Sequence, residues 1–543
     1  MSRRRLTPGA TAALLGLPVA FISYFFVYPL TAIFWRGLTA TGTLSFDPFL
    51  DVLTSPSLRG VAWFTVWQAL VSTLLTLAVG MPTAYVFARF RFRGRALLRG
   101  LSIVPFVLPT LVVGTAFLTL IGPNGALGID LRGTVWAILI AHVFYNYAIV
   151  VRGVGSFWEQ IDPRLEEAAR VLGASPWRTF TRVTFPLLRP AVLASASLIF
   201  LLSFTSFGVV LILGDLAHTT LEVEIWRQTT AFLRLDVAAA LAVLQLVGVG
   251  VLLVVYGRTS ARRSRELPLQ AGDTARPPRT RGQRLFVWTT VTFMMLFLGI
   301  PIAVLVVRSL RPAGGFGIDN YVGLFTATDS AFFVTAPEAM TNSLLFAFAA
   351  LVIAVVIGVL AAVSSAYSSS RIAAMIDSGL MLPLGASAVT IGFGFLVALD
   401  EPIDLRTSIM LIPIAHALVA IPFVIRTSLP VMRSVQQRLR DAAAVLGAGP
   451  LRVWREVDLP IVARAIGVGA AFAFAISLGE FGATAFIVRP GNATMPVAIF
   501  RLLSLPGATN FGRAMALSVI LMVLTGASVM FIDRLRRGTG GDI

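Results

Sequence analysis

The feature that most constrains this chain is a series of apolar runs of roughly twenty residues, the length of a helix that crosses about 30 Å of hydrocarbon. Leu14 to Trp35 and Ala470 to Val488 are two of them. Only 13% of the 543 residues are charged, whereas 57% are hydrophobic. An ordinary globular domain carries about twice that charged fraction. We therefore expect an all-α polytopic membrane protein.

Reading the runs against the loops between them gives about twelve spans. They lie near residues 11–36, 59–88, 97–121, 131–155, 190–213, 236–258, 285–309, 342–366, 372–399, 405–430, 463–488 and 512–532. The net charge of +18 comes from arginines that cluster between the spans. Because basic residues beside spans normally mark the cytoplasmic side, we expect both termini in the cytoplasm. The same placement disfavours a nucleic-acid partner.

The first apolar run, which follows three arginines, also has some features of a cleavable signal peptide. It is longer than a usual signal core, and no small-residue cleavage site follows Trp35 and Arg36. We therefore expect it to be the first transmembrane helix.

The sequence repeats itself, which indicates duplication. AlaHis at 141–142, ValLeuGlyAla at 171–174 and PheGly at 207–208 recur at 415–416, 445–448 and 481–482. We predict a first repeat at 1–257, a cytoplasmic linker at 258–284 and a second repeat at 285–543. Each repeat holds an even number of spans, so the two are parallel and a pathway between them is the expected functional site. The linker is rich in Arg, Pro and Gly, which predicts a disordered tether.

Two long cytoplasmic loops, 159–189 and 433–463, are patterned alike. Each composition predicts a helix, a break at Gly173 or Gly447, and a second short helix. Ser175 is expected to cap the second helix of the first loop. Apolar and aromatic residues then lie on one face of each short helix. Such a face needs a partner, either another protein or, as the alternative, the lipid surface.

Glu167-Ala168-Ala169, three residues, Gly173, nine residues, Val183, one residue and Phe185-Pro186 resemble the EAA loop of bacterial ATP-binding-cassette (ABC) importer permeases. The resemblance implies two parallel six-helix repeats of the type I importer fold in a bacterial inner membrane. It assigns contact with the ATPase to Glu167, Ala168, Ala169, Gly173, Trp177, Phe180, Pro186, Asp441, Ala442, Ala443, Gly447, Leu451, Trp454 and Pro460. Asp441 departs from the pattern, which is expected to weaken or lengthen its contact.

The implied partners are two copies of an ATPase subunit, an extracytoplasmic solute-binding protein and membrane lipid. The sequence contains no lysine, and a Walker-type phosphate loop requires one, so ATP hydrolysis is expected on another chain.

Without cysteine, thiolate metal sites are excluded. We expect no catalytic residues and no cofactor. His142 and His416, which are equivalent in the two repeats, are expected to pack between helices or to face a loop, with a proton relay as the less favoured alternative.

Polar groups inside the predicted spans suggest the pathway, because a carboxylate is costly there. Ser477 and Glu480 in the second repeat correspond to Ser203 and Ser206 in the first, and we predict that all four line the pathway. The alternative is an interhelical contact that fixes packing. The polar run at 219–224 is expected on the outer side, where it receives the binding protein or caps a turn.

The fused two-repeat form resembles thiamine and ferric-iron permeases, and residues 207–241 look more like the thiamine branch. The predicted function is therefore a permease subunit that translocates a small solute delivered by a binding protein, with thiamine favoured and ferric iron as the alternative. A secondary transporter with six plus six helices is the rival from another class. It would need coupling-ion carboxylates in the membrane and no ATPase partner.

Overall fold

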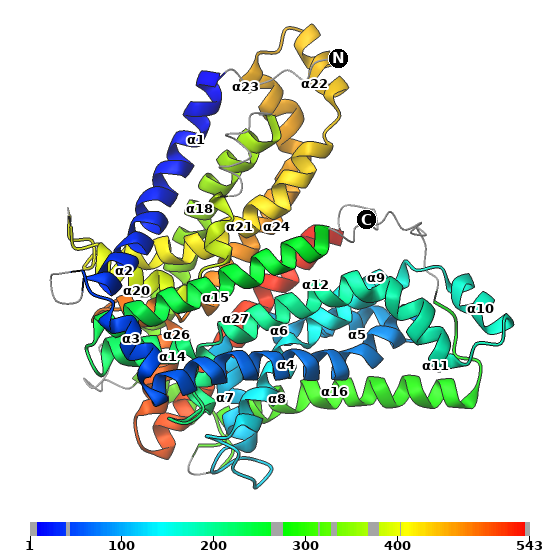
Figure 1. Ribbon diagram of the computed structural model, residues 1–543, viewed down its shortest axis with the longest axis horizontal. Coiled ribbons are helices and arrows are strands. Elements are labelled where there is room, and N and C mark those ends of the chain that lie inside the picture. Colours follow the sequence, from blue (N-terminus) through cyan, green and yellow to red (C-terminus); the bar gives the residue numbers. More distant parts are fainter. Residues whose placement is uncertain are drawn as a thin grey trace. The chain divides into compact units, whose positions relative to one another are not determined.

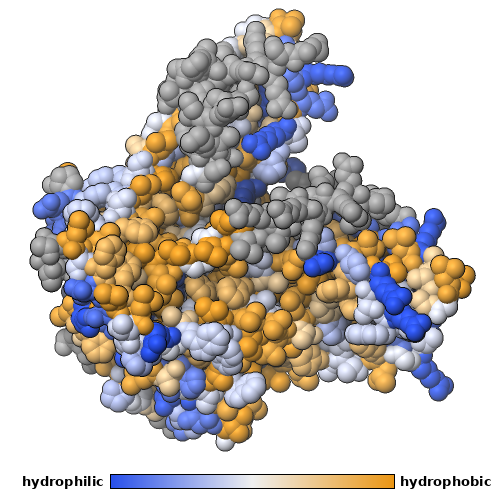
Figure 2. Space-filling model, in the orientation of Figure 1, coloured by the Kyte–Doolittle hydropathy of each residue, from blue (hydrophilic) through white to orange (hydrophobic). Residues whose placement is uncertain are grey.

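The computed structural model describes residues 8–39, 44–261, 275–312, 315–326, 334–367, 379–401 and 403–537. The regular elements in these ranges are helices (Figure 1). Ten of the described helices are long and apolar enough to cross a membrane, and one bent pair is an eleventh candidate. Apolar residues also cover much of the face drawn in Figure 2. The prediction of an all-α polytopic membrane protein is confirmed.

The predicted ninth span, 372–399, is described only in part. Residues 368–378 lie outside the described ranges, and the remainder contains the short apolar helix α20 (Ala388–Ala398). The total of twelve spans therefore stays a prediction.

The chain divides into two compact units. The N-unit comprises Val52–Glu224 and Leu244–Leu310, and the C-unit comprises Met1–Asp51, Ile225–Val243 and Arg311–Ile543. In the N-unit the long helix α4 (Pro56–Arg89) packs against α8 (Val135–Ile149) and α12 (Phe185–Phe204). In the C-unit α18 (Ala336–Tyr367), α21 (Leu411–Ser434) and α24 (Leu459–Gly479) contact one another, and α27 (Ala508–Arg537) contacts α24.

One close helix contact occurs in both units. A Cβ atom built on Gly80 of α4 would lie 2.7 Å from the Cβ of Val150, and one on Gly358 of α18 would lie 2.9 Å from the Cβ of Val424. Each glycine therefore lets two helices approach more closely than any side chain would allow. The internal repeat in the sequence thus has a counterpart in the packing.

The first helices of the two predicted repeats pack outside their own repeats. Helix α16 (Arg281–Ser309) opens the second repeat, yet it contacts α4 and α7 (Thr110–Ile121) of the N-unit. Helix α1 (Pro8–Ile22) opens the first repeat, yet it contacts α18 of the C-unit. The compact units therefore exchange these helices, and the repeat boundaries at 1–257 and 285–543 stay predictions from sequence.

The third predicted span, 97–121, is broken instead of straight. Its two parts, Arg95–Val107 and Thr110–Ile121, meet at 98°. Leu108 between them is extended, with φ −61° and ψ 137°, because the ring of Pro109 disfavours helical backbone in the residue before it. The Leu108-Pro109 pair was the signal for this break in the sequence. The prediction of one straight span followed the continuous apolar run instead.

The fifth and eleventh predicted spans start and end earlier than expected. The helical stretches in their place are Pro176–Phe204 and Leu451–Gly479. Each passes through a five-residue π turn, η3 (Phe180–Thr184) or η5 (Trp454–Asp458), just before Pro186 or Pro460. A proline cannot donate the i→i−4 hydrogen bond of an α-helix. The short loop helix and the span are therefore one continuous element in both repeats.

The predicted disordered linker is structured at both described ends. Helix α15 (Leu235–Ala261) extends into it, and Arg276 pairs with the chain that leaves α4. Arg91 donates its backbone N–H to the Arg276 carbonyl at 2.9 Å, and Arg276 donates to the Arg89 carbonyl at 3.1 Å. These backbone groups need partners once α4 has ended, so the disorder prediction is wrong there. Residues 262–274 lie outside the described ranges.

Replacing Gly80 with alanine tests the shared close contact. We expect Gly80→Ala to lower the free energy of unfolding by about 1–3 kcal/mol, because overpacking forces α4 and Val150 apart. Gly60→Ala on the same helix is the matched control, since no atom lies within 4 Å of its added Cβ. Thermal unfolding of the purified protein in detergent measures both. Equal midpoints for the two variants would contradict the close-packing interpretation.

Candidate functional site

The two patterned loops have the same backbone design. The first contains α10 (Pro163–Val171) and α11 (Pro176–Thr179), and the second contains α22 (Gln437–Val445) and α23 (Pro450–Val453). Between the helices, Gly173 and Gly447 both have φ +84°. L side chains rarely adopt this left-handed conformation, so glycine is favoured at both turns. The predicted order of helix, break and helix is confirmed in each loop.

The tip of each loop exposes large apolar side chains. Val171 and Leu172 are each 87% exposed, and Val445 and Leu446 are 87% and 86% exposed. Because burying apolar side chains away from water lowers the free energy, a repeated apolar tip indicates a contact surface, either for a protein or for the lipid surface. Sequence reasoning did not select these four residues, although they directly precede the two glycines.

On the predicted apolar face of each short helix, one of the two selected side chains is exposed and the other is partly buried. Trp177 is 71% exposed and Leu451 is 79% exposed. Phe180 and Trp454, which are equivalent in the two repeats, are only partly exposed. The ring of Phe180 packs against Trp158, with the centroids 6.2 Å apart. Phe180 therefore contributes mainly to the core of the N-unit.

The other predicted coupling residues lie on the same two loops with similar exposure. Ala168, Ala442, Pro186 and Pro460 are exposed, whereas Ala169 and Ala443 are partly buried. Glu167 is exposed and pairs with Arg276 at 2.6 Å. Asp441 is exposed and accepts a hydrogen bond from Gln437 at 3.0 Å. The shorter acidic side chain of the second repeat thus stays within its own helix.

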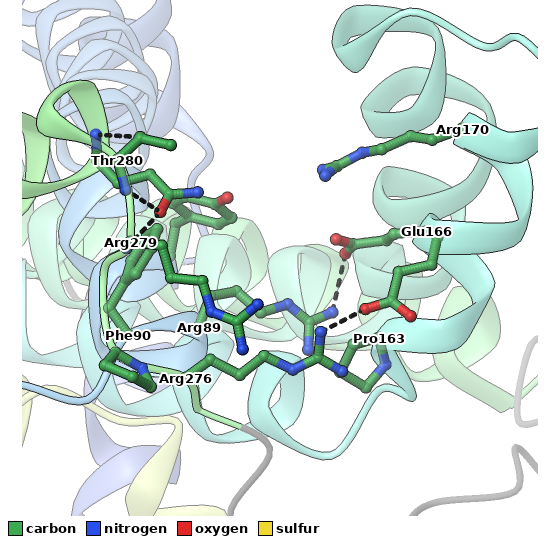
Figure 3. Close-up of a pocket in the computed structure, with 12 residues that line it drawn as sticks. Arg89, Phe90, Pro163, Glu166, Arg170, Arg276, Arg279 and Thr280 are labelled. Atoms are coloured by element: carbon green, nitrogen blue, oxygen red, sulfur yellow. Dashed lines mark hydrogen bonds and ion pairs between the residues drawn. The ribbon is translucent and has the colours of Figure 1, made fainter.

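A buried ion pair fastens the first loop to its span (Figure 3). Arg89, the last residue of α4, donates to Glu166 of α10 at 2.8 Å, with 8% and 12% of these side chains exposed. Arg89 also donates to the carbonyl of Ile161 at 3.0 Å. Thr184 of the π turn donates to the same carboxylate oxygen at 3.1 Å. Glu166 therefore joins α10, α4 and the π turn.

The second loop has the same kind of link with the charges reversed. Arg440 precedes Asp441 as Glu166 precedes Glu167, so a guanidinium replaces the carboxylate. It donates to Asp458 at 2.8 Å, with 14% and 4% of these side chains exposed. Asp458 stands in the π turn where the first repeat has Thr184. Both loops are thus fixed by a charged residue at the same helix position.

Sequence reasoning selected Glu167 and missed Glu166. Successive residues of a helix point in directions about 100° apart, so the two neighbouring carboxylates cannot both face inward. Which of them is buried depends on Arg89, which lies far away in the sequence. The adjacent acidic pair was the available signal, but it did not identify the inner residue.

Two buried histidines connect helices in the two units, as predicted. In the N-unit, His142 lies 3.0 Å from the hydroxyl of Ser72 and 2.8 Å from that of Ser206. In the C-unit, His416 lies 2.7 Å from the hydroxyl of Ser477 and 2.8 Å from that of Thr484. Equivalent histidines therefore each contact two buried hydroxyls, although these hydroxyls come from different positions of the two repeats.

The predicted pathway residues belong to these clusters. The Ser203 hydroxyl accepts from the side-chain amide of Asn146 at 3.3 Å. Glu480 contacts His416 at 3.1 Å and accepts from the backbone N–H of Ala483 at 2.9 Å. It also accepts from the backbone and hydroxyl of Thr484 at 3.2 and 3.0 Å. These contacts fix packing, and a pathway role for the four residues stays a prediction.

The polar run at 219–224 is buried, so the prediction of an outer receiving surface for it is wrong. Thr220 and Glu222 are fully buried, and Glu224 is 5% exposed. The Glu222 carboxylate accepts a hydrogen bond from Gln245. Thr220 donates to the carbonyl of Ser206 at 2.9 Å, which ties the run to the histidine cluster. Helix α14 (Leu221–Thr230) thus starts inside the bundle.

Removing Arg440 tests the reversed ion pair. We expect Arg440→Ala to lower the free energy of unfolding by about 3–5 kcal/mol, because the carboxylate of Asp458 stays buried without a partner. Replacing both residues with leucine should recover much of the loss, because no charge is then buried.

The matched control is Arg438→Ala on the same helix, where the side chain is exposed; surface changes of this kind usually stay within about 0.5 kcal/mol. Thermal unfolding and protease resistance of the loop measure all three variants. A loss for Arg438→Ala as large as that for Arg440→Ala would contradict the buried link.

Known transport permeases are similar to this chain. Residues 77–265 match the family described as "Binding-protein-dependent transport system inner membrane component". The chain is 30% identical over 491 residues to the thiamine transport system permease protein ThiP of Brucella suis biovar 1 (strain 1330), covering 87% of each chain. ThiP of Escherichia coli (strain K12) is 27% identical over 546 residues, covering 98% of this chain and 96% of that one.

A shorter relative matches about half of the chain. The sulfate transport system permease protein CysT of Escherichia coli (strain K12) is 32% identical over 264 residues, which are 47% of this chain and 93% of that one. Together with the full-length relatives and the internal repeat, this agrees with two permease repeats in one polypeptide. The chain therefore belongs to the family of binding-protein-dependent inner-membrane transport permeases, as a fused-repeat permease of the ABC importers.

Proposed function

We propose that this permease imports thiamine, that its two loop tips dock on two copies of a separate ATPase subunit, and that a binding protein delivers the solute from outside. The arginine-rich segments then lie in the cytoplasm together with both termini. The observation that carries the proposal is the pair of matching loops, each with an apolar tip, a left-handed glycine and a buried ion pair.

The structure of each loop allows a movement of its tip to reach a membrane span. Each short helix continues through its π turn into a membrane span, so a displacement of the tip moves the span as well. In the second loop the buried ion pair holds α22 against this continuous element, and in the first loop the hydrogen bond from Thr184 to Glu166 does so, while the ion pair itself joins α10 to α4. Two equivalent tips provide two docking positions, which suits a pair of identical ATPase subunits. ATP would shift the permease only by binding one arrangement of the tips better than the other.

Buried oxygen atoms in the N-unit favour a cationic solute. The side-chain carbonyl oxygens of Gln68, Asn146 and Gln245 are buried without a hydrogen-bond partner among the described residues. The same bundle contains the buried carboxylate of Glu222. Thiamine is an organic cation with an amino group, so it can satisfy such acceptors, whereas sulfate would be repelled. The similarity to the thiamine permeases ThiP supports the same choice, and ferric iron is the second candidate.

Gly447→Val tests the coupling role. A β-branched side chain is strained at φ +84°, by about 1–3 kcal/mol, and the tip should lose its docking geometry. We expect uptake to fall at least about tenfold, with unchanged protein in the membrane and less ATPase copurified.

Gly449→Val in the same turn is the control, since its position is open and its φ is not left-handed. Equal uptake by the two variants would oppose a coupling role for the turn.

Glu222→Gln tests the solute. In cells without another thiamine uptake route, we expect the wild-type chain, expressed with its partners, to accumulate radiolabelled thiamine but neither sulfate nor ferric iron. Glu222→Gln should raise the KM for thiamine, because the neutral amide attracts a cation less than the carboxylate does. Glu401→Gln, at an exposed carboxylate, should leave uptake unchanged. Accumulation of sulfate in place of thiamine would overturn the solute assignment.

A further inference from the structure

A cavity of about 290 Å³ lies where the first loop meets the start of α16 (Figure 3). Its walls come from the end of α4, from α10 and from the segment 276–283. Four arginines line it, Arg89, Arg170, Arg276 and Arg279, against the two carboxylates of Glu166 and Glu167. The lining therefore carries an excess of two positive charges.

The excess belongs to two arginines on opposite walls. Arg89 and Arg276 are neutralised by Glu166 and Glu167, at 2.8 and 2.6 Å. Arg170 and Arg279 form no ion pair with any carboxylate in the described part of the chain. Arg170 extends from α10 toward the cavity, and Arg279 comes from the segment before α16 (Figure 3). Two guanidinium groups that face one cavity suit a phosphate, which accepts hydrogen bonds from both.

The cavity lies at the ends of two membrane spans. Helix α4 ends at Arg89 and α16 begins at Arg281, so the cavity lies at one end of both candidate spans. Phe286 of α16 contacts Tyr85 of the cavity wall, with the rings 6.1 Å apart, and is 42% exposed. Leu285 and Trp288 nearby are 70% and 53% exposed. An apolar surface thus begins beside the charged cavity, which suits a ligand with acyl chains.

We propose that this cavity binds the phosphate of an anionic phospholipid, with the headgroup between Arg170 and Arg279 and the acyl chains along the exposed face of α16. Basic pockets between helices on the cytoplasmic side are a general mode of acidic lipid recognition. The lipid would join α10, and with it Glu167 of the coupling loop, to the first helix of the second repeat. The inference is independent of the transported solute.

Lipid retention tests the proposal. The full chain is reconstituted in nanodiscs of phosphatidylcholine with or without phosphatidylglycerol, and bound lipid is measured by native mass spectrometry. We expect the double variant Arg170→Gln/Arg279→Gln to retain phosphatidylglycerol about a hundredfold less than the wild type, since two charge-assisted hydrogen bonds are lost and each is worth about a factor of ten. Phosphatidylglycerol should also raise the unfolding midpoint of the wild type but not of the variant.

The matched control removes two exposed arginines outside the cavity. Arg178→Gln/Arg182→Gln carries the same change of charge on the neighbouring helix, and its retention of phosphatidylglycerol should equal that of the wild type. Equal losses in both double variants would mean nonspecific attraction and would overturn the site. If Arg170→Gln/Arg279→Gln does not fold, Arg279→Gln alone gives the same comparison.

Soluble phosphate distinguishes the two possible sources of the ligand. Inorganic phosphate or glycerol phosphate is added in excess to the detergent-purified protein. We expect neither to raise the unfolding midpoint as phosphatidylglycerol does, because neither has acyl chains for α16. Stabilisation by inorganic phosphate equal to that by the lipid would assign the cavity to a free anion and overturn the lipid proposal.

Discussion

The buried ion pair at the base of each loop is the interaction on which the rest of the proposed mechanism depends. Charges taken out of water are costly, so each pair persists only because its geometry and its additional hydrogen bonds compensate. In the first loop the carboxylate of Glu166 receives Arg89 and Thr184. In the second, Arg440 reaches Asp458. Without these links the first helix of each loop, α10 or α22, would no longer be fastened to the element beside it.

Buried polar contacts also organise the interior of each unit. A buried histidine collects serine and threonine hydroxyls from neighbouring helices in both bundles. The bundles differ in their carboxylates. Glu480 is satisfied by His416 and by the start of α25 (Thr484–Ile487), whereas Glu222 accepts from Gln245, whose amide oxygen lacks a partner among the described residues. One bundle is thus fully paired around its acid, and the other retains buried acceptors.

Much of the fold was predictable because it follows from local pattern. The apolar runs predicted the membrane helices. The duplicated loop residues predicted two helices with a turn between them at Gly173 and at Gly447. What depended on distant partners was not predictable. The burial of Glu166 depends on Arg89, the position of Phe180 on Trp158, and the exchange of α1 and α16 on packing between segments far apart in sequence. The coupling and pathway assignments remain predictions.

The reversed charges of the two loops have a genetic consequence. Fused repeats that remain similar in sequence are substrates for recombination within the gene. An exchange of loop helices would place Glu166 beside Asp458, or Arg440 beside Arg89, so that like charges met in a buried position. The recombined loop would repel its own span. Helices α10 and α22 are therefore not interchangeable between the two loops.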